Sequence, residues 1–211
     1  MEYQVQKQVF IPIDGIAVEG DLVIPANAKS VVIFSHGSGS SRFSPRNRQV
    51  AEYLHGLGFG TLLFDLLTPQ EDAIYRNRFD IGLLTERLVG ATQWLEKQAE
   101  TKGGRFGYFG ASTGAASALA AAARLPQIAA VVSRGGRPDL AGDALSLVKA
   151  PTLLIVGSLE DDILILNQQA LERLGGVGAL GMVLGATHLF EEPGKMREVE
   201  QLAGAWFQKY L

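Results

Sequence analysis

Short, almost wholly apolar segments recur along this chain, and stretches with helical periodicity separate them. A strand that is buried on both faces of a parallel sheet has this composition, because helices cover both of its sides. Alternation of such strands with helices is typical of a mostly parallel sheet packed between two helical layers. The pattern therefore predicts an α/β fold, in which chemistry is expected at the carboxyl ends of the strands.

The positions of the expected elements follow from these segments. Residues 4–13 and 16–25 flank Asp14-Gly15, a pair that favours the tight turn of an antiparallel β-hairpin. The further expected strands are 31–36, 60–67 and 105–110, and the segments AAVVSRGG, PTLLIVG and GALGMVLG. The first expected helix begins near Pro45, and the others cover about 80–98, 113–125, 163–174 and 195–211.

The chain contains no linker, internal repeat or low-complexity tract, so we expect residues 1–211 to form a single domain. The longest irregular segment runs from Leu67 to Asp80, and we expect it to be a small mobile flap. No insertion is long enough for a separate cap domain. We therefore expect an open site that favours short acyl substrates over long lipids.

Composition excludes several classes of function. A net charge of −3 lacks the basic excess that nucleic-acid-binding proteins usually have. The chain has no cysteine, and its 3 histidines include no HExxH pair, which argues against disulfides, a cysteine nucleophile and a metal site. The first residues do not resemble a signal peptide, and no apolar run could span a membrane. We therefore expect a cytoplasmic protein with no nucleic-acid or membrane partner, and the sequence leaves its oligomeric state open.

The segment GYFGASTGAA contains a serine between two glycines, where an expected strand gives way to an expected helix. Gly110, Ser112 and Gly114 fit the pattern G-x-S-x-G, which in this context indicates a nucleophile elbow. Such a sharp turn exposes the serine hydroxyl, and it needs small residues where neighbouring backbone comes close. An ordinary glycine turn is the alternative interpretation.

A serine hydroxyl needs a base to become a nucleophile, and His188 is the best candidate. It follows the last expected strand, in agreement with the chain order serine, acid, histidine. His36 comes too early in the chain, and His55 lies in an expected helix, where a solvated or capping role is expected. Glu191 and Glu192 follow closely and could pair with an active-site arginine or cap the last helix.

The acid of such a triad should follow the segment PTLLIVG, where Glu160, Asp161 and Asp162 are consecutive. A carboxylate at this point would accept the second N–H of the histidine, fix its tautomer and stabilise the imidazolium. Asp161 or Asp162 could instead cap the helix that is expected to begin near Ile163. The two roles are compatible, with one carboxylate for each.

An oxyanion hole would complete the site. The backbone N–H of Thr113 is one expected donor, because Thr113 follows the serine in the elbow. The second donor should come from the loop HGSGSS, where Gly37, Ser38 and Gly39 can bring N–H groups close to a developing oxyanion. We favour Ser38, and a flexible turn is the alternative interpretation of this loop.

The chain resembles the α/β-hydrolase superfamily, and within it the small dienelactone-hydrolase-related group, in the segments SHGSGSSRFSPRNR, GYFGASTGAA, VVSRGGRPDLAG, LLIVGSLEDDILILN and GATHLFEEPG. The resemblance covers nearly the whole chain and implies an α/β-hydrolase fold, Ser112 as nucleophile, His188 as base and an acid within 157–163. The superfamily usually has G-x-x-D-x-x-V there, which implies Glu160 as the acid, with Asp161 as the alternative. True dienelactone hydrolases use a cysteine nucleophile, so the resemblance does not imply dienelactone as the substrate.

Arginines gather in two loops that should face the site: Arg42, Arg46 and Arg48 after HGSGSS, and Arg134 and Arg137 after AAVVS. Guanidinium groups pair with carboxylate or phosphate, so Arg134 and Arg137 could bind an anionic substrate. The interpretation that we favour is that they pair with Asp139 and Asp143 or hold backbone carbonyls.

These features predict a serine hydrolase that acts on a small ester, thioester or lactone through an acyl-enzyme on Ser112, without a cofactor. The same triad would serve acyl transfer to an acceptor other than water. A non-catalytic relative that binds a small ligand or a partner protein is a third interpretation, against which the complete triad argues. The glycines of GYFGASTG fit neither dinucleotide-binding nor P-loop patterns.

Overall fold

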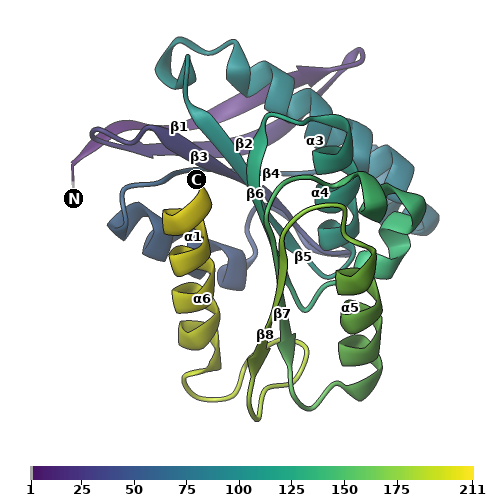
Figure 1. Ribbon diagram of the computed structural model, residues 1–211. Coiled ribbons are helices and arrows are strands. Elements are labelled where there is room, and N and C mark those ends of the chain that lie inside the picture. Colours follow the sequence, from purple (N-terminus) through teal and green to yellow (C-terminus); the bar gives the residue numbers. More distant parts are fainter. Residues whose placement is uncertain (1) are drawn as a thin grey trace.

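The computed structural model describes residues 2–211, in which the strands are β1 (Tyr3–Ile13), β2 (Ile16–Pro25), β3 (Ser30–Ser35), β4 (Gly60–Phe64), β5 (Arg105–Ala111), β6 (Ile128–Arg134), β7 (Thr152–Gly157) and β8 (Gly178–Val183). They form one 8-stranded sheet in the order β1-β2-β4-β3-β5-β6-β7-β8 (Figure 1). β2 pairs antiparallel with β1 and β4, and the other neighbours are parallel. This arrangement confirms the predicted α/β fold with its N-terminal antiparallel hairpin.

Helices cover both faces of the sheet (Figure 1). One face is covered by α1 (Pro45–Gly56) and α6 (Lys195–Tyr210), and the other by α3 (Ile81–Glu96), α4 (Thr113–Arg124) and α5 (Asp161–Arg173). The shorter helices are α2 (Pro69–Asp72), η1 (Tyr75–Phe79), η2 (Ala99–Thr101) and η3 (Pro138–Leu147). Within residues 2–211, no helix has the length and apolar character needed to cross a membrane.

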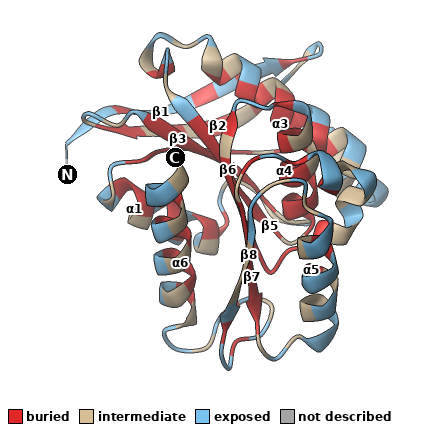
Figure 2. Ribbon diagram, in the orientation of Figure 1, coloured by how far each residue is buried: buried red, intermediate tan, exposed pale blue. Residues whose placement is uncertain are grey.

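The sheet separates two hydrophobic clusters, and its central strands are mostly buried (Figure 2). Every residue of β3, β4 and β7 is buried, as expected for strands covered on both sides. In β5, Tyr108 belongs to the cluster that contains α3 and α4, and Phe109 belongs to the cluster that contains α1 and α6. Successive side chains therefore anchor β5 from opposite faces, which fixes the turn that follows it.

The alanine-rich sequence of α4 lets this helix lie directly against the centre of the sheet. Most of its residues are buried, among them Ala115, Ala118 and Ala122. A Cβ atom on Gly114 would lie 2.2 Å from the carbonyl oxygen of Ser35, which ends β3. Small side chains thus bring the first turn of α4 against the carboxyl end of the sheet, directly after Ser112.

Residues 67–80 contradict the expectation of an irregular flap, because they form α2 and η1. The side chain of Thr68 accepts a hydrogen bond from Glu71 N, and the side chain of Glu71 accepts one from Thr68 N. These two bonds form a capping box at the start of α2. Glu71 also pairs with the buried Arg87 of α3 at 2.6 Å. These short helices escape sequence analysis because one turn shows no periodicity, and their contacts hold the segment against the protein.

Two element boundaries and one additional element also differ from the prediction. β4 ends at Phe64 rather than at residue 67, and the carboxylate of the next residue, Asp65, accepts a hydrogen bond of 2.8 Å from Arg42 N. The sequence did not predict η3, whose helical backbone geometry is interrupted at Gly142, where φ is 57°. α5 begins at Asp161, so neither Asp161 nor Asp162 occupies the N-cap position.

Candidate active site

Ser112 lies at the carboxyl end of β5 and immediately before α4, in the strand-to-helix turn that the sequence predicted. Its backbone has φ 52° and ψ −122°, a region that non-glycine residues rarely occupy. Its N–H donates a hydrogen bond of 3.2 Å to the carbonyl oxygen of Arg134 on β6. A Cβ atom on Gly110 would lie 2.5 Å from Ala115 Cα, which explains the small residue before the serine.

His188 and Glu160 come together from the loops after β8 and β7. His188 Nδ1 lies 2.9 Å from Glu160 Oε1, and the side chains are 38% and 13% exposed. When the imidazole is neutral and donates Nδ1–H to this carboxylate, its Nε2 carries a lone pair. Within residues 2–211, neither Asp161 nor Asp162 hydrogen-bonds to His188, since both lie in the first turn of α5.

The last residue of β6 and the residue after it contact Ser112 and His188, respectively. Arg134 accepts the hydrogen bond from Ser112 N, and the next residue, Gly135, lies against His188. A Cβ atom on Gly135 would lie 3.4 Å from both Nδ1 and Cε1 of the His188 ring. Among the residues from 2 to 211, Ser112 Oγ has no hydrogen-bond partner, so its bond to His188 is not formed in this arrangement. Hydrogen bonds between catalytic groups are often long before substrate binds.

Gly135 lies against His188, and sequence analysis did not identify this contact. Its φ of 52° suits glycine, and a side chain would also approach the His188 carbonyl oxygen to 3.1 Å. The available signal was the pair of glycines directly after the strand AAVVSR, at an edge where other loops were already expected to meet.

The loop after β3 packs against Ser112. A Cβ atom on Gly37 would lie 3.1 Å from Ser112 Cβ. Ser38 N donates a hydrogen bond of 2.9 Å to Thr113 Oγ1. The two expected oxyanion donors, the N–H groups of Ser38 and Thr113, therefore belong to residues that are in direct contact, although the N–H of Ser38 already has a partner.

The other two histidines are buried and have structural partners. His36 Nε2 accepts a hydrogen bond of 3.1 Å from Leu66 N, and burial lowers the pKa of His36. His55 Nε2 lies 2.8 Å from Thr61 Oγ1, and burial lowers the pKa of His55 to about 4. The expectation of a solvated or capping role for His55 was wrong, because its side chain turns toward β4 instead of solvent.

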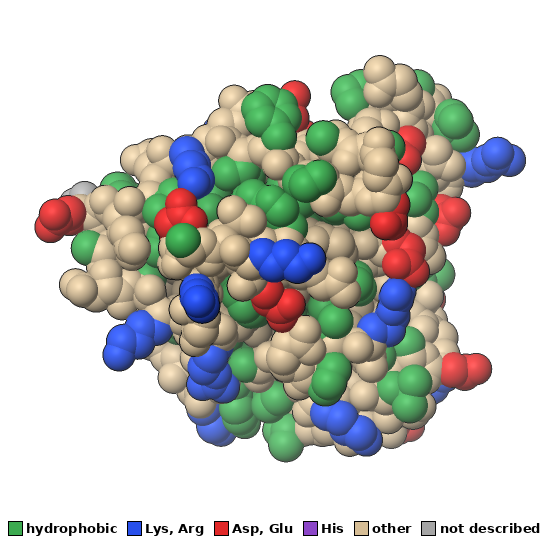
Figure 3. All heavy atoms as spheres, turned by 90° about the horizontal axis from the view of Figure 1, so that it is seen from above, with side chains coloured by type: hydrophobic (Ala, Val, Ile, Leu, Met, Phe, Trp, Pro, Cys, Tyr) green, Lys and Arg blue, Asp and Glu red, His purple; other side chains and the backbone are tan. Residues whose placement is uncertain are grey.

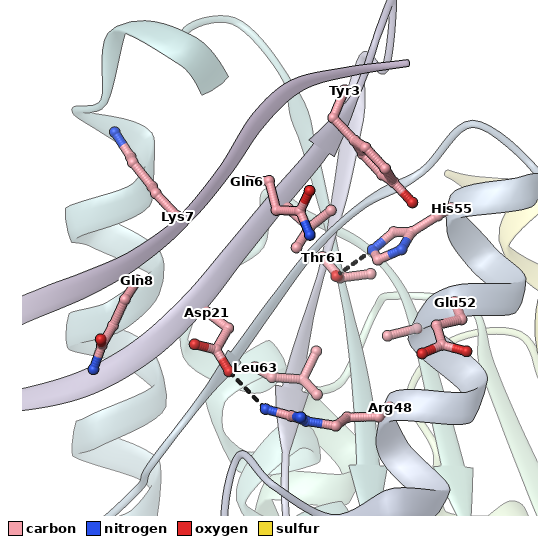
Figure 4. A pocket seen from close by; sticks show the side chains of 12 residues that line it. Tyr3, Gln6, Lys7, Gln8, Asp21, Arg48, Glu52, His55, Thr61 and Leu63 are labelled. Carbon is pink, nitrogen blue, oxygen red and sulfur yellow. Dashed lines mark hydrogen bonds and ion pairs between the residues drawn. The ribbon is translucent and has the colours of Figure 1, made fainter. Parts of the chain in front are cut away.

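His55 lines a groove of about 430 Å³ between α1 and the strands β1, β2 and β4 (Figure 4). Tyr3 packs edge-on against the His55 ring, and Arg48 pairs with Asp21 at 3.1 Å across the groove. The groove lies on the hairpin side of the molecule, and neither Ser112 nor His188 lines it.

The loop arginines have different environments. Arg137 makes two bonds of 2.8 Å to Asp139, which confirms the favoured interpretation for this residue. Asp143 pairs with Arg173 instead of Arg134. Arg134 is 6% exposed and donates to Asn47 Oδ1 at 3.3 Å, so the expected carboxylate partner was wrong.

The remaining arginines form ion pairs around the loop after β3: Arg42 with Glu19 and Asp65, Arg48 with Asp21, and Arg46 with Glu191. Glu191 thus pairs with an arginine of α1, one of its two expected roles. Glu192 accepts hydrogen bonds from the backbone and hydroxyl of Thr187, which braces the loop that contains His188.

Charge is dispersed on the face of the molecule that Figure 3 shows. When the molecule is viewed from above relative to Figure 1, basic and acidic side chains are interspersed among hydrophobic ones (Figure 3). Within residues 2–211, no group of three or more His, Asp or Glu side chains is arranged to hold a metal ion.

Comparisons with known proteins agree with this architecture. A crystal structure of a dienelactone hydrolase from Anabaena variabilis has a TM-score of 0.96 and 52% sequence identity, and the match covers 100% of both chains. Est1E from Butyrivibrio proteoclasticus has a TM-score of 0.79 over 96% of this chain and 98% of that chain. At 14% identity, the second likeness is evidence for the fold alone.

Curated relatives come from Mycobacterium tuberculosis. A protein of strain H37Rv, provisionally named a phosphoribosyl transferase, is 55% identical over 197 residues, which are 93% of this chain and 44% of that protein. Its counterpart in strain CDC 1551 matches to the same extent. The chain therefore spans less than half the length of the curated relatives it matches.

A family model matches residues 18–200, which is most of the chain. The matched model describes the dienelactone hydrolase family, and the structural neighbours include named esterases, such as one from Pyrococcus furiosus with 18% identity over 98% of this chain and 91% of that chain and a TM-score of 0.77. At 18% identity, the likeness to this esterase is again evidence for the fold alone. This chain belongs to the dienelactone hydrolase family and has the α/β-hydrolase fold.

Proposed function

We propose that this protein is a serine hydrolase that cleaves small esters, thioesters or lactones through an acyl-enzyme on Ser112. The main support is the bond of 2.9 Å between His188 Nδ1 and Glu160 Oε1, at the edge of the sheet where the strained Ser112 turn lies. A histidine oriented in this way by a carboxylate can accept a proton at Nε2. Membership of a hydrolase family supports the same chemistry.

The proposed reaction has two steps. Ser112 Oγ attacks the carbonyl carbon while His188 Nε2 accepts the hydroxyl proton, which then passes to the departing alkoxide or thiolate. The acyl group remains on Ser112. Water then gives a proton to His188 and attacks the acyl carbon, and Ser112 regains that proton when the acid leaves. In both steps Glu160 stabilises the imidazolium.

The N–H groups of Thr113 and Ser38 are the proposed donors to the oxyanion. Thr113 is the first residue of α4, so its N–H has no acceptor within the helix, and the positive end of the helix dipole lies at the same point. The N–H of Ser38 would have to share its hydrogen with Thr113 Oγ1, its present acceptor at 2.9 Å, or exchange that hydroxyl for the oxyanion.

We attribute the name phosphoribosyl transferase to the part of the mycobacterial relatives that this chain does not match. That name describes proteins of which the alignment covers 44%, and the aligned part is the one that belongs to a hydrolase family. Phosphoribosyl transfer is therefore not part of the proposed function.

Hydrolysis of p-nitrophenyl acetate, butyrate and decanoate, together with a short thioester and a lactone, tests the proposal. We expect turnover of the short esters, slower turnover of the decanoate, and an initial burst of nitrophenol equal to the enzyme concentration. In Ser112→Ala and His188→Ala, kcat should fall by about 10³-fold or more while the circular dichroism spectrum stays the same. Unchanged hydrolysis by Ser112→Ala would overturn the proposal.

A further inference from the structure

Arg134 is a buried arginine with no carboxylate partner within residues 2–211. It is 6% exposed, its Nη2 donates to Asn47 Oδ1 at 3.3 Å, and its Nε has no partner. Arg87 is buried to the same degree, at 7% exposure, but it pairs with Glu71 at 2.6 Å. Burying an ionised group is costly unless an opposite charge compensates it. Arg134 therefore has a requirement for an anion that the described part of the protein does not meet.

A second arginine lies beside the first. Arg46 and Asn47 are neighbours in the first turn of α1. Burial of Arg134 and, to a smaller extent, the positive charge of Arg46 lower the pKa of Arg134 to about 10. Arg134 therefore remains a cation near neutral pH. The Nε atom of Arg46 is also buried without a partner.

Within residues 2–211, the carboxylate that pairs with Arg46 is weakly held. Arg46 Nη1 lies 2.9 Å from Glu191 Oε1, and the two side chains are 32% and 64% exposed. Glu191 can therefore leave Arg46 and be solvated at small cost, because exposed ion pairs contribute little to stability.

The start of α1 favours an anion at the same place. Ser44 caps this helix and Pro45 begins it, and its first turn contains no acidic residue. By contrast, α5 has Asp161 and Asp162 in its first turn. Pro45 has no N–H and Asn47 N already donates to Ser44 Oγ at 3.3 Å, so the helix dipole is the main attraction for an anion here.

We propose that Arg134 and Arg46 form an anion subsite that binds a carboxylate or phosphate group of the ester substrate, which takes the place of Glu191. The assignment of this anion to the substrate rests on the proposed hydrolase function. The backbone of Arg134 accepts a hydrogen bond from Ser112 N, and Glu191 belongs to the same loop as His188. The backbone of Arg134 and the loop of Glu191 therefore adjoin the proposed nucleophile and base, and the subsite suits an acyl or leaving group with an acidic end. Two guanidinium groups can bind such an end through several charge-assisted hydrogen bonds.

Binding of inorganic phosphate to the Ser112→Ala protein tests the subsite without any need for catalysis. We expect phosphate at about ten times its Kd to raise the Tm of this protein by about 3–6 °C. The rise should be absent when Arg134→Met is added, and it should persist with Arg48→Met, which removes an arginine of the same helix that pairs with Asp21. An equal rise with and without Arg134→Met would overturn the proposal.

Glu191→Gln provides a second test that does not disturb a buried residue. Because this change leaves Arg46 without its carboxylate, we expect phosphate to bind at least several-fold more tightly than to the parent protein. Unchanged or weaker binding would contradict exchange of Glu191 for the ligand. This result remains informative even where Arg134→Met fails to fold.

Kinetics distinguish a substrate group from a free anion. A nitrophenyl ester with a terminal carboxylate should be hydrolysed with a higher kcat/KM than its neutral methyl-ester analogue, and Arg134→Met should reduce this preference at least tenfold while the neutral ester is affected less. Phosphate should inhibit competitively. Phosphate binding without competitive inhibition or carboxylate preference would assign the anion to a separate effector and overturn the substrate assignment. Failure of ester hydrolysis altogether, with phosphate binding intact, would instead count against the hydrolase proposal alone.

Discussion

His188 Nδ1 lies 2.9 Å from Glu160 Oε1, and this bond joins the loops that follow two neighbouring parallel strands, β7 and β8. Asp161, the next residue, begins α5 and makes no such bond among residues 2–211. The triad acid that sequence patterns left open between the two is therefore assigned here to Glu160 as a proposal. Its carboxylate has the geometry needed to fix the histidine tautomer.

Glu160→Gln should lower kcat by about 10²–10⁴-fold, because the amide cannot stabilise the imidazolium and can favour the wrong tautomer. Asp161→Asn is the matched control, and its kcat should stay within about threefold of the wild-type value, since surface substitutions away from the site have small effects. Initial rates on p-nitrophenyl acetate measure both. A larger loss in Asp161→Asn than in Glu160→Gln would assign the acid to Asp161.

Ser112→Gly should be more stable than Ser112→Ala. Both variants lack the hydroxyl, but only glycine adopts φ 52° and ψ −122° without strain. We expect a difference of about 0.5–2 kcal/mol in the free energy of unfolding, after the greater flexibility of glycine in the unfolded chain is counted. Urea denaturation at neutral pH measures it, and a less stable glycine variant would show that the turn is not strained.

Gly135→Ala should displace His188 and lower kcat/KM at least tenfold. The new methyl group would lie 3.4 Å from the imidazole ring and 3.1 Å from the His188 carbonyl oxygen. Gly142→Ala is the control, because its φ of 57° is similar but no atom lies within 4 Å of its added Cβ. Both variants should lose stability through the positive φ, and only Gly135→Ala should lose activity beyond that loss. Equal kcat/KM values in the two folded variants would contradict contact with His188.

The stability of the protein should fall as the pH drops from 6.5 to 4, and His55 should contribute to this fall. Burial lowers the pKa of His55 to about 4, below its value of about 6.5 in an unfolded chain. Between these values the unfolded chain binds a proton that the folded protein does not, so acid favours unfolding. The contribution is fully present above pH 6.5 and is lost by pH 4.

His55→Gln removes this titration and leaves a polar partner for Thr61. We expect the variant to lose less stability than the wild type between pH 7 and pH 4.5, measured by urea denaturation at each pH. His36, whose pKa burial also lowers, is present in both proteins and cancels in the comparison. Parallel losses in the two proteins would show that His55 is not the group that titrates.

Local sequence patterns were sufficient to predict most of the fold. Asp14 and Gly15 have φ of 48° and 83°, as a tight hairpin turn requires, and β3 and β7 are buried throughout, as their composition predicted. Ser44 and Pro45 mark the start of α1 with ordinary helix signals. These features depend on residues that are near one another in the chain, so patterns can reveal them.

The contacts that shape the site depend on residues far apart in the chain. The approach of Gly135 to His188 and the pair formed by Arg46 and Glu191 arise only when loops from several strands meet. Arg137 pairs with Asp139, two residues away, and was anticipated. Arg134 differs because its side chain turns inward toward α1, a direction that sequence spacing alone does not determine.

Labelling with a fluorophosphonate probe, followed by intact mass and peptide mapping, tests the central claim most directly. The account predicts one adduct per chain, located on Ser112, with labelling lost in Ser112→Ala and strongly slowed in both His188→Ala and Glu160→Gln. Folded wild-type protein that takes up no probe, or takes it up at another residue, would contradict the assignment of Ser112 as an activated nucleophile.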